Sequence, residues 1–352
     1  MTKKACEVRK IIGVSIIVLL CLAAFSPIEA KASDKSLYEK LDPDIRADYL
    51  KLPRMKLEGD GLAKCRAEFE RLIGSFDLPK DPSVRVYDHY IQNSDNTGRM
   101  RLRIYEPLNR KDKAPGIYWI HGGGLIMGAP EESEDLNIRF ATEVGAVVVA
   151  VDYRMAPEHP YPAPVEDCYS GLKWFSDNAS FFGVDNKRIA VIGVSAGGGL
   201  CAATAIMARD RNGPEIAFQM PLYPMIDDRM ATPASNMDLD HRLWNKDANK
   251  FAWNAYLGDI PDEKRTSYMA AAREKDLSGL PPTYTCVGEL DIFRDDTVNY
   301  VQRLLHAGVP VEFHLYPGCI HGFEAYAQNA PVSVRAINEY VRVLKRAVGT
   351  DK

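Results

Sequence analysis

The stretch that most constrains the fold is residues 188–200, which read RIAVIGVSAGGGL. Its first half is rich in Ile and Val, as is typical of a strand buried on both faces, and the helix-forming sequence CAATAIMARD follows it. Between them lies a G-x-S-x-G pattern centred on Ser195. On a strand-to-helix turn, this pattern exposes the serine hydroxyl and directs helix amides toward developing negative charge. The pattern alone also fits an ordinary glycine turn. Its position between a strand and a helix is what indicates a catalytic serine.

The first 32 residues have the layout of a secretory signal peptide. A basic start is followed by an uncharged apolar run at 11–25 and by Ala30-Lys31-Ala32, which offers an A-x-A cleavage site. The apolar run is shorter than the ~20 residues that a membrane-spanning helix needs. We therefore expect cleavage of residues 1–32 and a secreted or periplasmic protein. The alternative is a membrane anchor formed by an uncleaved signal.

Charge and cysteine content narrow the classes of partner. The leader holds five of the 44 Lys and Arg residues and two of the 48 Asp and Glu residues, so the rest of the chain has a net charge of −7. This negative net charge, together with the absence of a run of basic residues in the sequence, argues against binding to nucleic acid or to an anionic membrane. The five cysteines beyond the leader show no metal-ligand spacing. We expect buried free thiols, with two disulfides and one free thiol as the alternative in an oxidising compartment.

Strand and helix patterns alternate along most of the chain. Residues 33–80 are helical in character, with a helix at 62–73, and the patterns at 84–91 and 100–106 form a hairpin. Further strands are predicted at 116–121, 146–152, 188–194, 215–223, 282–289 and 311–316, and further helices at 133–144, 164–178, 294–307 and 332–347. This order predicts an α/β fold with an eight-stranded, mostly parallel sheet that has helices on both faces.

One segment lacks the hydrophobic pattern of strands. Residues 227–276 are polar, helix-leaning and contain Trp244 and Trp253. We interpret them as an insertion over the carboxyl ends of the strands, where open α/β sheets bind ligands. The predicted organisation is a signal peptide at 1–32, cap helices at 33–80, and a catalytic domain at 81–352 that carries the insertion. The two tryptophans, with Tyr223, are candidates for a substrate pocket, although they could equally pack the cap onto itself.

A serine hydroxyl becomes a nucleophile only when a base accepts its proton, and a third group must orient that base. Of the seven histidines, His321 follows the last strand in a loop flanked by glycines. Asp291 follows the preceding strand, with Glu289 and Asp295 as close rivals. Because Ser195, Asp291 and His321 each come just after a strand, we expect them to converge at one edge of the sheet.

A pocket for an oxyanion is predicted beside the serine. His121-Gly122-Gly123-Gly124 comes directly after the third strand, and glycine amides can approach a substrate without side chains intervening. Gly122 and Gly123 would donate together with the amide of Ala196, the residue after the serine. A flexible loop is the structural alternative. The turn from Tyr153 to Glu158 is expected to support this loop.

Several motifs together resemble one family. HGGG, YRMAPEHPYPAPVEDC (153–168), GVSAGGG, PLYP (221–224), DLSGLPP, GELDIFRDD and HGF (321–323) occur in the order seen in the hormone-sensitive-lipase-like branch of the α/β-hydrolases. The match covers about residues 80–345. The resemblance implies an α/β-hydrolase fold with a helical cap, no cofactor and no metal. It also implies Ser195 as nucleophile, Asp291 as acid, His321 as base, and Gly122, Gly123 and Ala196 as oxyanion donors. Val194 departs from the Asp or Thr usual in that family's elbow, which puts the subfamily in question.

The expected activity is that of a serine carboxylesterase acting on short-acyl or small aromatic esters through an acyl-enzyme. A deacetylase, amidase or thioesterase using the same residues is the alternative within enzymes, and a non-catalytic ligand-binding member of the fold is the alternative outside them. The expected partner is a small ester molecule, with no nucleic acid and, after cleavage of the leader, no membrane. The oligomeric state stays open, with a homodimer among the alternatives.

Overall fold

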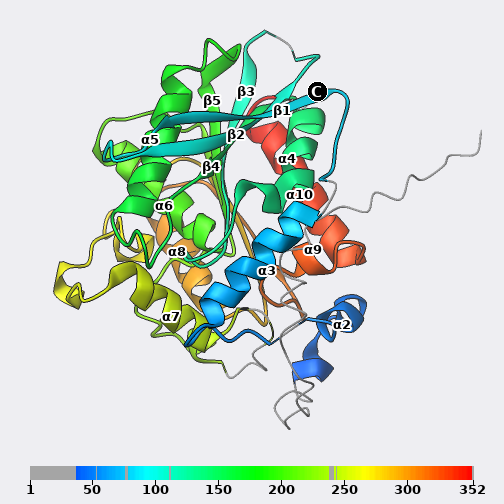
Figure 1. The fold of residues 1–352 in the computed structure, drawn as a ribbon, viewed down its shortest axis with the longest axis vertical. Helices are drawn as coiled ribbons and strands as arrows, with labels where there is room; N and C mark the ends of the chain where they lie inside the picture. The colour runs from blue at the N-terminus through cyan, green and yellow to red at the C-terminus, as the bar shows by residue number, and fades with distance from the viewer. Residues whose placement is uncertain are drawn as a thin grey trace, which may run out of the picture.

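The computed structural model describes residues 37–350, except for 53, 76–77, 111, 238–241 and 243. These residues form one eight-stranded sheet in the order β1-β2-β4-β3-β5-β6-β7-β8 (Figure 1). Its strands are β1 (Val84–Gln92), β2 (Arg99–Pro107), β3 (Ala114–Ile120), β4 (Val147–Asp152), β5 (Val184–Val194), β6 (Phe218–Leu222), β7 (Thr283–Gly288) and β8 (Val311–Tyr316). Strand β2 is antiparallel to β1 and β4, and the other neighbours are parallel. The predicted α/β-hydrolase sheet is confirmed.

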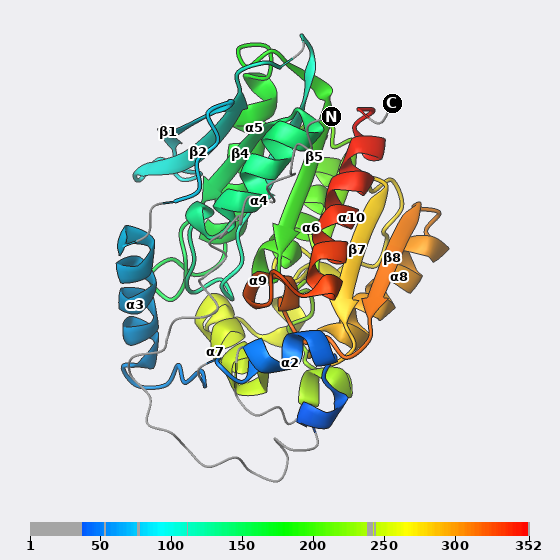
Figure 2. The same cartoon turned by 90° about the vertical axis from the view of Figure 1, so that its right-hand side faces the viewer.

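Helices cover both faces of this sheet. On one face lie α4 (Glu134–Arg139) and α10 (Pro331–Ala347), and on the other lie α5 (Ala163–Asp177), α6 (Ala196–Asp210) and α8 (Arg294–His306) (Figure 2). Alternate residues of a strand enter opposite cores: Tyr118 packs with α5 and α6, whereas Trp119 packs with α4 and α10. Because both faces are buried, the central strands are continuous apolar runs rather than alternating ones.

The predicted helix at 133–144 takes three forms in succession. A 3₁₀ turn, η1 (Pro130–Ser133), leads into α4, and a π-type turn, η2 (Phe140–Val144), ends at Gly145 with φ 73°. The apolar spacing of such short turns is too similar to separate the three helix types in a sequence. The other predicted strands and helices are present, with ends that differ by a few residues.

Two groups of helical segments lie outside the layers. From the N-terminal part come α2 (Pro43–Tyr49) and α3 (Gly61–Ser75); from the segment 227–276 come α7 (Lys246–Leu257) and the short turns η3 (Ala234–Asn236), η4 (Asp262–Lys264) and η5 (Ala271–Arg273). A four-residue helix, α9 (Phe323–Tyr326), precedes α10. Figure 2 shows α2 and α7 beyond the carboxyl ends of β5 and β7. Arg242 joins the two groups, because its guanidinium donates to the carbonyls of Leu50 and Leu52.

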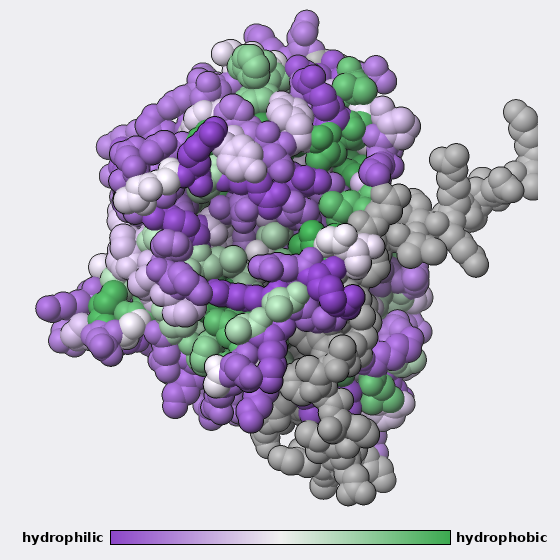
Figure 3. Space-filling view, viewed as in Figure 1, coloured by the Kyte–Doolittle hydropathy of each residue, from purple (hydrophilic) through white to green (hydrophobic). Residues whose placement is uncertain are grey.

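The predicted signal peptide, residues 1–32, lies outside the described residues. Within the described ranges, no helix combines the length and apolar character needed to cross a bilayer. The face seen in Figure 3 is mainly hydrophilic, with apolar residues scattered over it. All five cysteines in the described ranges are buried and form no disulfide there, in agreement with the expected buried thiols. Burial raises the pKa of the Cys201 thiol to about 12.

Candidate active site

The serine of the G-x-S-x-G pattern lies on a sharp turn between β5 and α6. Ser195 has φ 56° and ψ −120°, a strained conformation for a residue with a Cβ atom. Its amide donates to the carbonyl of Leu222 (3.0 Å), and its carbonyl accepts from the amide of Met225 (2.9 Å). A Cβ atom on Gly197 would collide with the carbonyl of Ile120, so the crossing of helix and strand requires glycine there. The neighbouring chain thus holds the strained turn in place.

Three side chains from three loops form a continuous hydrogen-bonded relay. The Oγ atom of Ser195 lies 2.8 Å from Nε2 of His321, and Nδ1 of His321 lies 2.7 Å from Oδ2 of Asp291. The Asp291 side chain is fully buried, and that of His321 is 12% exposed. This arrangement fixes one tautomer: Nδ1–H donates to the carboxylate, and Nε2 is left to accept the serine proton.

The sequence leaves Glu289 and Asp295 as rivals to Asp291, and the geometry separates them. The carboxylate of Glu289 accepts from the amide of Gly318 at 2.8 Å. That of Asp295 pairs with Arg294 and accepts from the amide of Ala234. Of these three carboxylates, it is that of Asp291 that hydrogen bonds to His321. Asp291 is itself held by the amide of Phe293, which donates to its Oδ1 at 2.9 Å.

Two aromatic rings fix the imidazole from its sides. Tyr223 and Phe293 meet the ring of His321 edge-on, with centroids 5.1 and 5.0 Å away. Tyr223 is one of the three residues predicted to line a substrate pocket. It is buried, and its ring contacts the imidazole of the triad. The sequence analysis did not predict a role for Phe293. Its position two residues after Asp291 is the one feature of the sequence that could have indicated it. The imidazole therefore has little freedom to rotate away from the serine.

The glycine loop after β3 adjoins the serine. A Cβ atom built on Gly122 would lie 3.4 Å from that of Ser195 and 3.4 Å from a methyl group of Val194. Gly123 has φ 93°, and a Cβ there would collide with the backbone of Met127. Across the described ranges, the amides of Gly122, Gly123 and Ala196 donate to no protein acceptor. Free amides beside a serine hydroxyl are the donors that a tetrahedral oxyanion requires.

The turn after β4 supports this loop, as the sequence predicts. The Tyr153 hydroxyl lies 3.1 and 3.2 Å from the carbonyls of His121 and Gly122, and its ring stacks on that of His121. Burial lowers the pKa of His121 and so favours its neutral imidazole. From α3, Arg66 donates to the carbonyl of Ile126 and pairs with Glu158. The glycine loop is thereby tied to two other segments.

The two tryptophans of the segment 227–276 differ in their surroundings. The indole of Trp244 fills the space beside Gly124, where a Cβ atom would collide with it. Its Nε1 donates to Asn249 at 3.3 Å. Trp253 is buried next to Tyr256, with ring centroids 6.2 Å apart. Trp244 therefore contacts the glycine loop, and Trp253 packs against Tyr256 of its own helix.

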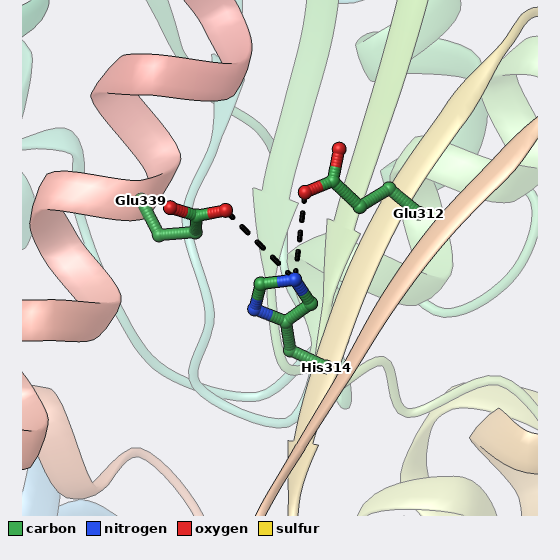
Figure 4. A group of neighbouring side chains, drawn as sticks. All are labelled: Glu312, His314 and Glu339. Carbon is green, nitrogen blue, oxygen red and sulfur yellow. Dashed lines mark ion pairs between the residues drawn. The ribbon is translucent and has the colours of Figure 1, made fainter.

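One group away from the triad has the donor types of a metal site. Glu312 and His314 on β8 face Glu339 on α10, with ligand atoms within 4.8 Å of one another (Figure 4). Arg342 pairs with both glutamates, and Arg346 also pairs with Glu312. Because guanidinium groups already neutralise the carboxylates, these residues form a surface ion-pair network, which does not fit a cation.

Comparisons with known proteins agree with this geometry. Residues 117–325 match the family described as alpha/beta hydrolase fold. The carboxylesterase NlhH of Mycobacterium tuberculosis is 33% identical over 310 residues, covering 88% of this chain and 96% of the relative. An arylesterase of Saccharolobus solfataricus is 30% identical, covering 80% and 92%. The solved structure of a bacterial heroin esterase has a TM-score of 0.84 and 37% identity, covering 88% of this chain and 99% of that one.

Proposed function

The chain belongs to the hormone-sensitive-lipase-like branch of the alpha/beta hydrolase fold family and is a carboxylesterase, and from this premise we propose that Ser195, His321 and Asp291 are its catalytic triad. The observation that carries the proposal is the unbroken relay from Oγ of Ser195 through His321 to the buried carboxylate of Asp291. A nucleophile, a base and an orienting acid at hydrogen-bonding distance are what acyl transfer by serine requires.

The geometry leads to the following steps. The Oγ atom of Ser195 attacks the ester carbonyl carbon while Nε2 of His321 accepts the hydroxyl proton, and Asp291 stabilises the imidazolium. The carbonyl oxygen gains negative charge and accepts hydrogen bonds from the amides of Gly122, Gly123 and Ala196. When the C–O bond to the alcohol breaks, His321 returns its proton to the leaving oxygen. Water then attacks the acyl-enzyme by the same route, which releases the acid and restores Ser195.

We further propose that residues 33–80 and 227–276 form a cap, and that the preferred substrates are short-acyl or small aromatic esters. Trp244 supports this preference, because its indole takes up space directly beside the glycine loop. The arylesterase relative also supports an aromatic substrate. Rates on acetyl, butyryl and palmitoyl esters of one phenol test the proposal. We expect acetyl or butyryl to be fastest, and a preference for palmitoyl would refute it.

The triad is tested by stoichiometric labelling with a fluorophosphonate. We expect one label per chain in the wild type and none in Ser195→Ala, together with a fall in kcat of at least about 10⁴-fold. Ser170→Ala, in α5 and away from the relay, is the matched control and should label normally. Full esterase activity in Ser195→Ala would contradict the assignment. Hydrolysis of the matched aryl amide in place of the ester would favour the amidase alternative.

We also propose, from residues 1–32 alone, that the protein is exported and that this leader is removed. The test is the N-terminal residue of the protein expressed in a bacterium and collected from the periplasm or medium. We expect a chain that begins near Ser33. A chain that keeps Met1 and sediments with membranes would instead support the uncleaved anchor.

A further inference from the structure

One arginine joins helix α3 to the glycine loop. The side chain of Arg66 is 24% exposed, so its contacts are largely shielded from water. Its Nε donates to the carbonyl of Ile126 at 2.7 Å, and Nη2 donates to the carbonyl of Ala156, also at 2.7 Å. Its two terminal nitrogens pair with the two carboxylate oxygens of Glu158, at 2.7 and 3.0 Å. One guanidinium thus connects α3, the glycine loop and the turn after β4.

Ile126 is connected in turn to a proposed oxyanion donor. Its amide donates to the carbonyl of Gly123 at 3.2 Å, and the amide of Met127 donates to the same carbonyl at 3.0 Å. Gly123 is therefore held through its carbonyl, while its amide donates to no acceptor in the described ranges. Arg66 holds the same turn from its other side, because it binds the carbonyl of Ile126. A movement of Ile126 would be transmitted to Gly123.

The backbone of this loop is strained and needs contacts from outside. Residues 123–125 have φ angles of 93°, 65° and 66° in succession. Glycine adopts such angles readily, but Leu125 does not, because its Cβ atom crowds the backbone carbonyl. Strained backbone persists only where surrounding contacts hold it. Leu125 is held by the amide of Ala156, which donates to its carbonyl at 2.9 Å, and the next carbonyl along the loop is the one that Arg66 binds.

Two side chains bracket the proposed donors Gly122 and Gly123. On one side, the Tyr153 hydroxyl lies within hydrogen-bonding distance of the carbonyls of His121 and Gly122. On the other side, Arg66 binds the loop from a helix outside the layers of the sheet. A guanidinium paired with a carboxylate is a planar, charged donor and makes stronger hydrogen bonds than a neutral hydroxyl does. The conformation of the glycine loop therefore depends on its contact with α3.

We propose that Arg66 is a positioning residue of the oxyanion pocket: by binding the carbonyl of Ile126 from α3, it holds the amide of Gly123 where the transition state needs it. The inference rests on the proposed function of the triad and of the glycine loop. Arg66 acts through the loop and does not contact the substrate. Docking of α3 is then part of forming the active site, and its loss weakens catalysis while the relay from Ser195 to Asp291 stays intact.

The first test compares the kinetics of Arg66→Met with those of the wild type. Met keeps the apolar stem of the side chain and removes its donors. Because oxyanion donors act in the transition state, we expect kcat and kcat/KM on an acetyl ester to fall together, by about 10- to 100-fold, with KM changed less than twofold. The kcat is counted per chain that a fluorophosphonate labels, so that unfolded protein does not contribute.

A second readout is the affinity for an aryl trifluoromethyl ketone. Its adduct with Ser195 is a hemiketal whose oxyanion occupies the pocket, whereas the corresponding secondary alcohol forms no oxyanion. We expect the inhibition constant of the ketone to rise in Arg66→Met by about the factor by which kcat/KM falls. That of the alcohol should change less than twofold. Loss of general stability alone would move neither constant once the labelled chains are counted.

Arg71→Met is the matched control. Arg71 lies on the same helix, is more exposed, and pairs with Glu68 of α3 itself. Its replacement should leave kcat per labelled chain and both inhibition constants unchanged. If Arg66→Met does not fold, Arg66→Lys replaces it in the test. Lysine keeps the charge, but its single ammonium lacks the fork that reaches two carbonyls and a carboxylate, so the same changes should occur by a smaller factor.

The outcomes separate the two proposals. A wild type that a fluorophosphonate does not label refutes the triad itself. A wild type that labels fully, together with an Arg66→Met variant that equals it in kcat per labelled chain and in affinity for the ketone, refutes the role of Arg66 and leaves the triad intact. A rise in KM at constant kcat also refutes that role, because Arg66 would then act in substrate binding. Equal losses in Arg71→Met refute it as well, since any change in α3 would produce them.

Discussion

At the scale of single residues, the glycine loop depends on a backbone conformation that a residue with a side chain cannot adopt. Gly123 combines φ 93° with a collision between any Cβ atom and the backbone of Met127. Gly123→Ala should therefore displace the loop and lower kcat by about 10²–10³-fold, which is the effect of losing one oxyanion donor. Steady-state kinetics on an acetyl ester measure this.

Gly145→Ala controls for backbone strain alone. Gly145 has φ 73°, but a Cβ there meets no atom within 4 Å. We expect it to lower the free energy of unfolding by about 1 kcal/mol and to leave kcat unchanged. If both variants lose activity equally, strain rather than displacement of the loop is responsible, and the argument for Gly123 fails.

The triad could be predicted from the sequence because each member follows a strand and parallel strands end at one edge. The choice among Asp291, Glu289 and Asp295 needed the loop geometry, since they lie within seven residues of one another. The contact of Phe293 with His321 could not be predicted, because the sequence does not show how the loops after β7 and β8 meet.

At the scale of elements, one buried carboxylate joins the β1–β2 turn, the turn after β4 and helix α5. Asp167 is fully buried and accepts from Ser94 and, through both oxygens, from the guanidinium of Arg154 at 2.8 and 2.9 Å. Asp167→Asn leaves that guanidinium with a weaker partner. We expect the free energy of unfolding to fall by about 3 kcal/mol, as when buried pairs lose one member.

Chemical denaturation measures this change, with Asp177→Asn as the control. Asp177 lies on the same helix and pairs with Lys173, but both side chains are more than half exposed. Its replacement should therefore cost less than about 0.5 kcal/mol. Similar losses in the two variants would show that burial of the Arg154–Asp167 pair contributes no stability.

Most strands and helices could be predicted from the sequence, because strands that are covered on both faces are unbroken apolar runs between turn residues. The segment 227–276 was harder to predict: its polar sequence indicates helix, but its described residues contain α7 and short turns at η3, η4 and η5. Their positions are set by tertiary contacts, such as those of Arg265 and Arg273 with the buried carboxylate of Asp228. Such contacts leave no periodic pattern.

At the scale of the whole molecule, a buried acid at the start of α8 makes stability depend on pH. Asp296 is 4% exposed, and burial next to Asp227 raises its pKa to about 7. The folded state therefore holds this proton where the unfolded chain, near 4, has lost it. The resulting stabilisation is complete below about pH 4 and is lost as the pH rises through 7.

Asp296→Asn removes this titration, so the decline in stability between pH 5 and pH 8 should be smaller than in the wild type by about 2–3 kcal/mol. Urea unfolding at both pH values measures the difference, with Asp259→Asn, an exposed residue after α7, as the control. Asp295, the neighbour of Asp296 in the chain, accepts from the amide of Ala234 in the segment beside the active site. Alkaline conditions should thus weaken first the junction between α8 and the segment beside the active site. An identical pH dependence in Asp296→Asn and the wild type would show that this carboxyl is ionised in the folded protein.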